Sequence, residues 1–148
     1  MFPRPSRAER AILLFLLVAL ASLVAVLASV EPDRRGFGTH ERLPFGIPRC
    51  SWPATVGIPC PTCGVTTAAC HLVHGHVVRA FLVQPFGAAL MAAGLAAGCA
   101  IVWHLARNRS LFWRMSSWRW ARVVLSAVLL GLTAWGYKVL LFLDARTS

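Results

Sequence analysis

"AILLFLLVALASLVAVLASV", residues 11–30, is a run of twenty residues without a charged side chain. An α-helix needs about 20 apolar residues to cross the roughly 30 Å hydrocarbon layer of a bilayer. Two further runs meet the same requirement: 86–106 is interrupted only by His104, and 123–143 only by Lys138. The sequence therefore predicts an all-α integral membrane protein with transmembrane helices at 11–30, 86–106 and 123–143.

The first run also has features of a cleaved signal peptide. Basic residues precede it, and Ala19-Leu20-Ala21 is a plausible cleavage site. The apolar core of a signal peptide usually has about 7–15 residues, whereas this run continues to Val30. We therefore expect an uncleaved anchor.

The net charge of +10 is concentrated beside the apolar runs. Short loops rich in Lys and Arg stay in the cytoplasm. The connection 107–122 carries five arginines and no acid, and three arginines lie in 1–10. This pattern predicts a cytoplasmic N-terminus at 1–10, an extracytoplasmic loop at 31–64 and a cytoplasmic loop at 107–122. The charge is thus a topology signal with an attraction to lipid headgroups, and we expect no nucleic-acid partner.

Residues 65–83 are apolar enough to be considered as a fourth span. They contain three histidines and Arg79, however, and such groups are costly to place in the bilayer centre. A fourth span would also move the arginine-rich loop outside. We therefore predict an interfacial or re-entrant helix over 65–83, ended by Gln84-Pro85 before the second span. The tryptophans between Ser110 and Arg122 predict a second, short interfacial helix on the cytoplasmic side.

Small residues within the spans indicate how the helices pack. Gly94 and Gly98 form a Gly-x-x-x-Gly pattern, and Ala127 with Gly131 repeats the spacing. Such patterns let helices approach closely. They predict that the second helix packs on the third or on a second copy of the chain. Lys138 lies near the outer end of its helix and is expected to extend toward the interface.

The segment "GIPCPTCGVTTAACHLVHGH", residues 57–76, concentrates cysteine and histidine in a proline-braced turn. Proline fixes φ, and glycine allows positive φ. We expect Thr66 or Thr67 to cap the following helix. Cys63 would then precede the positive end of that helix, which stabilises a thiolate.

Three interpretations of the cysteines remain open. A structural disulfide would join Cys50 to Cys60 or Cys63 in an oxidising compartment. A zinc site would use Cys50, Cys60 and Cys63 with His74 or His71 as a fourth ligand. Thiol–disulfide exchange fits the Cys-Pro-x-Cys form, but such motifs normally lie on a βαβ scaffold that this sequence lacks. We favour the disulfide.

The stretch from Cys50 to about residue 86 resembles a bacterial family of small membrane proteins, the domain of unknown function 2752. The family usually has arginine, an acidic residue and asparagine where this sequence has Thr67, His76 and Gln84. The resemblance implies a bacterial inner-membrane location and a shared extracytoplasmic motif within about 45–100. It implies no activity. The motif residues are Cys60, Pro61, Cys63, Gly64, Thr66, His74, Gly75 and Pro85.

These observations favour a non-enzymatic membrane component in the lipid bilayer, such as a partner-binding or assembly subunit. The alternative is a membrane thiol oxidoreductase or a zinc-binding protein at the outer interface. A reactive Cys63 would support the enzyme, and a permanently paired Cys63 the structural role.

Overall fold

A computed structural model describes residues 4–44, 48, 50–116 and 118–147, so small parts of the expected 1–10, 31–64 and 107–122 segments lie outside it. The regular elements of this described part are all helical. Three of the helices are long and apolar enough to cross a membrane, as the apolar runs predict. They are α1 (Arg7–Ala28), α5 (Pro85–Ala106) and α7 (Trp120–Thr147).

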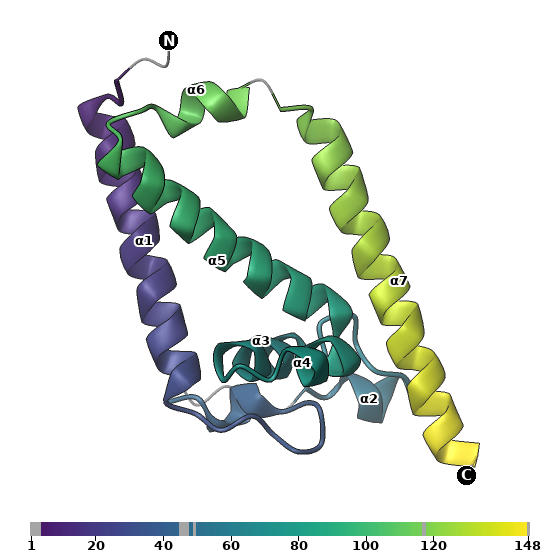
Figure 1. The fold of residues 1–148 in the computed structure, drawn as a ribbon. Coiled ribbons are helices and arrows are strands. Elements are labelled where there is room, and N and C mark those ends of the chain that lie inside the picture. The colour runs from purple at the N-terminus through teal and green to yellow at the C-terminus, as the bar shows by residue number, and fades with distance from the viewer. Residues whose placement is uncertain (1–3, 45–47, 49, 117, 148) are drawn as a thin grey trace.

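The long helices connect two ends of the molecule (Figure 1). The N-terminus and α6 (Leu111–Ser116) lie at one end, which we call the α6 end. The C-terminus lies at the other, together with α2 (Trp52–Thr55), α3 (Val65–Val73) and α4 (Val77–Val83), and we call this the cysteine end. The arginine-rich connection and the cysteine segment thus lie at opposite ends of the long helices.

Helix α1 begins four residues before the predicted span. The Ser6 side chain accepts a 3.0 Å hydrogen bond from the Glu9 amide and caps the helix. The buried Glu9 carboxylate in turn accepts hydrogen bonds from the Ser110 hydroxyl at 2.9 and 3.0 Å and from the Phe112 amide at 3.0 Å. The charged first turn is therefore part of α1, and its Glu9 side chain connects α1 to the beginning of α6.

The predicted helix over 65–83 is divided into α3 and α4. Gly75 has φ of +79°, a conformation that ends a helix. The two short helices pack against the beginning of α5, where a Cβ on Gly87 would come within 2.8 Å of the Val65 Cα. The buried core lies at this junction. It has two clusters: Leu27, Cys70 and Met91 from α1, α3 and α5, and Ala68, Ala80 and Ala88 from α3, α4 and α5.

Within the chain, the Gly-x-x-x-Gly pattern faces α1 and not the third helix. Helix α5 presents Gly98 to Leu20 of α1, and a Cβ on Gly98 would lie 2.7 Å from the Leu20 Cδ2. The third helix contacts α5 elsewhere, with Gly131 facing the ring of Phe86. Much of the apolar surface of α1 and α7 is exposed, as expected for helices surrounded by hydrocarbon.

The predicted interfacial helix from Ser110 to Arg122 is also divided. Helix α6 ends at Ser116, and α7 already begins at Trp120. The rings of Trp118 and Trp120 are 5.8 Å apart, and both are exposed at the α6 end.

Candidate functional site

The turn before α3 is fixed by its own backbone. The Cys63 amide donates to the Cys60 carbonyl at 3.0 Å, and the Val65 amide donates to the Thr62 carbonyl at 3.1 Å. Gly64 has φ of +88° and is the N-cap of α3, without a side-chain cap. The expected cap by Thr66 or Thr67 is therefore absent at this described helix end. A Cβ on Gly64 would lie 2.8 Å from the Gly36 carbonyl, so the turn requires glycine.

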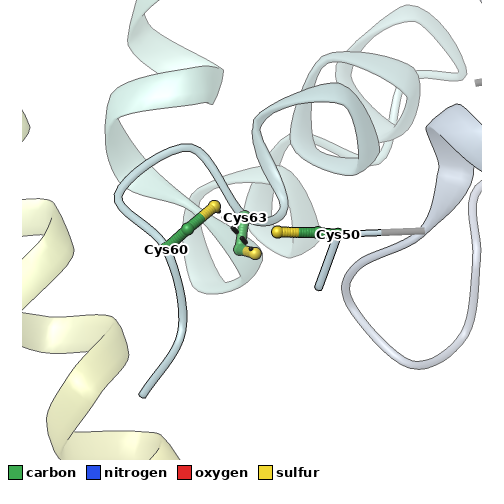
Figure 2. A group of neighbouring side chains, drawn as sticks. All are labelled: Cys50, Cys60 and Cys63. Carbon is green, nitrogen blue, oxygen red and sulfur yellow. Dashed lines mark hydrogen bonds between the residues drawn. The ribbon is translucent and has the colours of Figure 1, made fainter. Parts of the chain in front are cut away.

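Cys50, Cys60 and Cys63 form one group, which we call the cysteine centre. Their sulfur atoms all lie within 4.8 Å of one another. The Cys60 and Cys63 sulfurs are 3.1 Å apart, and Cys50 points toward Cys63 from the side opposite Cys60 (Figure 2). All three are half-buried free thiols. The sequence separation of Cys50 gave no indication of which of the other two it would approach, and the fold brings it to both.

The two thiols of the turn have different acidities. Burial opposes ionisation of Cys60, but hydrogen bonds with Thr62 and Cys63 outweigh it and lower the Cys60 pKa. Burial, followed by the hydrogen bond with Cys60, raises the pKa of Cys63 to about 12. Cys60 is therefore the first to form a thiolate. This differs from the expectation for Cys63, because burial and the neighbouring thiolate outweigh the effect of the helix end.

Helix α7 contacts the turn through polar side chains. The Trp135 indole donates to the Pro59 carbonyl at 2.9 Å. The Lys138 ammonium donates to the Val83 carbonyl at 3.0 Å and to the Gly36 carbonyl at 3.3 Å. The extension of Lys138 toward the interface stays a prediction, and the structure shows that its half-buried ammonium bonds to carbonyls of the cysteine end. The signal available in the sequence was a lysine and a tryptophan one helical turn apart in an otherwise apolar run.

The segment preceding η1 (Thr39–Arg42) completes the surroundings of the cysteine centre. Asp33 is 2% exposed and pairs with Arg35 at 2.9 Å and with Arg42 at 3.2 Å. The Arg35 hydrogen bonds hold the pKa of Asp33 at about 2, below its usual 3.8. The Thr39 hydroxyl donates to the Thr67 hydroxyl at 2.8 Å, which joins the start of η1 to α3.

A cavity of about 440 Å³ lies beside the cysteine centre. Its wall combines thiols with charged and hydroxyl groups, so a ligand of the cysteines would have access from this side. The polar and sulfur-bearing residues of the wall are Arg35, His40, Glu41, Cys50, Cys60, Thr62, Cys63, Thr66 and Thr67.

His74 lies at the other end of α3 from the turn. It is the C-cap of the helix, and its Nδ1 is 2.9 Å from the Cys70 carbonyl. Among the described residues, the convergent group of possible metal ligands consists of the three cysteines, without His74 or His71. A histidine at i+11 from Cys63 would need the helix to reverse before it could approach the turn.

The remaining motif residues join the turn to α5. Pro85 is the first residue of α5, as predicted. The Gln84 side chain before it is 1% exposed, and its amide donates to the Pro61 carbonyl at 3.2 Å. Gly75 occupies the break between α3 and α4. Two distant parts of the motif are therefore in direct contact, which spacing alone did not indicate.

No curated protein and no solved structure matches the chain. Residues 50–98, which contain the cysteine centre, α3, α4 and the first part of α5, match one family model. This confirms the resemblance seen in the sequence, because the matching family is described as "Protein of unknown function (DUF2752)".

Proposed function

We propose that the protein is a non-enzymatic component of the bacterial inner membrane whose cysteine centre has a structural role on the outer side. The observation that carries this proposal is the convergence of three sulfurs within 4.8 Å. They lie in a turn that contacts three other parts of the molecule. Pro61 is bonded to the residue before α5, Pro59 is bonded to α7, and Gly64 lies against the segment before η1. A covalent or metal link at this point stabilises the whole cysteine end.

The centre is best explained by a disulfide that includes Cys50. In the chain-entropy model, a bond from Cys50 to Cys60 or Cys63 closes a loop worth about 3 kcal/mol, whereas a Cys60–Cys63 bond closes a much shorter loop worth about 2 kcal/mol. The longer link also fastens the segment around Cys50 to the turn. Disulfides persist in the oxidising compartment outside the inner membrane.

A zinc centre is the second candidate, because a disulfide uses only two of the three convergent sulfurs. Thiolates are preferred zinc ligands, and the adjoining cavity leaves room for a fourth. Three thiolates and Zn²⁺ carry a net charge of −1. The Lys138 ammonium, which would lie 2.7 Å from a Cβ on Gly64, offsets part of that charge.

Thiol counting combined with metal analysis distinguishes these candidates. The unreduced protein is purified in detergent, unfolded and reacted with a maleimide. A disulfide leaves three reactive thiols, the five cysteines less the two in the bond. A zinc centre gives five reactive thiols and one equivalent of zinc. Five thiols without bound metal would contradict both forms of the proposal.

The proposed orientation places the α6 end in the cytoplasm. Its support is the excess of arginine at that end and the tendency of positive loops to remain inside. A reporter that works only in the cytoplasm should be active when inserted within α6. A reporter that works only outside the inner membrane should be active when fused after α7. The reverse pattern would contradict this orientation.

A further inference from the structure

A second cavity at the cysteine end, of about 660 Å³, is separate from the cysteine centre. We call it the basic cavity. It lies between the segment that follows α1 and the helices α3 and α4. Its ionisable lining is dominated by nitrogen bases, with a single carboxylate from Glu31. The bases are Arg34, His71, His74, His76 and Arg79.

Several polar groups of the basic cavity have no hydrogen-bond or ion-pair partner among the described residues. His71 is 8% exposed, and its Nδ1 is buried without a hydrogen bond in the described part of the chain. Arg34 and Arg79 are exposed and form no ion pair with any described residue. The two exposed guanidinium groups can therefore take a ligand without breaking an ion pair with a described residue.

The charge of the basic cavity selects an anion. Burial, and then Coulombic repulsion from His76, Arg79 and His74, lower the pKa of His71. An anion would relieve this repulsion, whereas a metal cation would add to it. The histidines of the basic cavity also do not converge as metal ligands. Among the described residues, the one convergent group of possible metal ligands is the cysteine centre.

The surface beside the basic cavity is apolar. Helix α4 exposes Val78 by 73% and Leu82 by 59%, and Phe81 is exposed as well. Leu82 also lines the cavity, so the apolar face and the basic groups are continuous. A phospholipid has the same arrangement, with a charged phosphate next to acyl chains, and α4 is suited to lie at the membrane surface.

We propose that the basic cavity binds the phosphate group of an anionic membrane phospholipid, with Arg34 and Arg79 holding the phosphate oxygens and the acyl chains lying against α4. The guanidinium group suits this role because it presents a planar pair of donors to phosphate. His71 lies in the wall beside them. This site is independent of the chemical state of the cysteines.

The test measures lipid retained by the full chain in a zwitterionic detergent. Phosphatidylglycerol is titrated, and the bound fraction is read by native mass spectrometry. We expect Arg34→Ala and Arg79→Ala each to weaken binding about fivefold, which corresponds to the loss of one modest charged contact. Arg79→Lys, which keeps the charge but not the paired donors, should fall between Arg79→Ala and the unchanged protein.

Arg119→Ala is the matched control. It removes the same charge from an exposed position at the α6 end, outside the basic cavity, and should weaken retention much less than Arg79→Ala. Excess inorganic phosphate should not displace the lipid, because it lacks the acyl chains. Equal retention by the Arg79→Ala and Arg119→Ala proteins would overturn the proposal. Displacement of the lipid by inorganic phosphate would assign the cavity to a free anion and would also overturn it.

Discussion

Lys138 provides a sharp test of how α7 is attached. It is the only lysine in the chain, and it donates to the carbonyls of Val83 and Gly36 at 3.0 and 3.3 Å. Lys138→Met removes both hydrogen bonds and keeps an unbranched apolar side chain. A hydrogen bond from a charged donor contributes about 1.5–3 kcal/mol. Since the second bond is long and the ammonium no longer has to be desolvated, we expect a loss of about 2 kcal/mol.

The free energy of unfolding is measured by titrating the protein from mild detergent micelles into sodium dodecyl sulfate, with tryptophan fluorescence as the signal. Leu140→Met is the matched control, because Leu140 lies on the same helix and is 68% exposed. This control should change stability by less than about 0.5 kcal/mol. If the Lys138→Met protein unfolds with the free energy of the control, the hydrogen bonds do not attach α7 to the cysteine end.

Three further predictions test other contacts. Gly64→Ala should destabilise the protein by more than about 1 kcal/mol, since the positive φ and the Gly36 carbonyl 2.8 Å from the new Cβ both disfavour alanine. Gly57→Ala, with similar φ but open space, should cost only about 1 kcal/mol in the same unfolding titration. Glu9→Ala removes the acceptor of a hydroxyl and an amide, and should cost about 1–3 kcal/mol and increase proteolysis near α6. The lowered pKa of Asp33 stabilises the protein above about pH 4, and this contribution is lost as the pH falls toward 2. Because Arg35 is half-exposed and solvent screens the pair, we expect a loss of about 1–2 kcal/mol, absent from Asp33→Asn.

The three long apolar helices could be predicted because they depend on composition over about twenty residues. Runs without charge require no knowledge of partners, so the three long helices follow from residues 11–30, 86–106 and 123–143. Their ends depend on single contacts. Helix α1 begins at Arg7 because Ser6 caps it and Glu9 finds partners in a segment about a hundred residues away.

The tertiary pairings could be predicted less well. A Gly-x-x-x-Gly pattern indicates a close contact but not its partner, and Gly98 lies against α1 instead of α7. Lys138 donates hydrogen bonds within the protein because the carbonyls of Gly36 and Val83, from separate segments, both lie near its ammonium. The cysteines of the centre were identified from their residue type. The distance of His74 from them follows from the direction of α3, which a spacing of eleven residues does not reveal.

The central claim is that the cysteine centre stabilises the cysteine end of the molecule. Its most direct test is the free energy of unfolding, under oxidising conditions and without added chelator, of a protein in which Cys50, Cys60 and Cys63 are all replaced by serine. Cys99→Ser, at an exposed position on α5, is the control. We expect the triple variant to lose about 3 kcal/mol relative to that control, the stabilisation calculated for the loop closed by Cys50. A triple variant as stable as the Cys99→Ser protein would contradict the account.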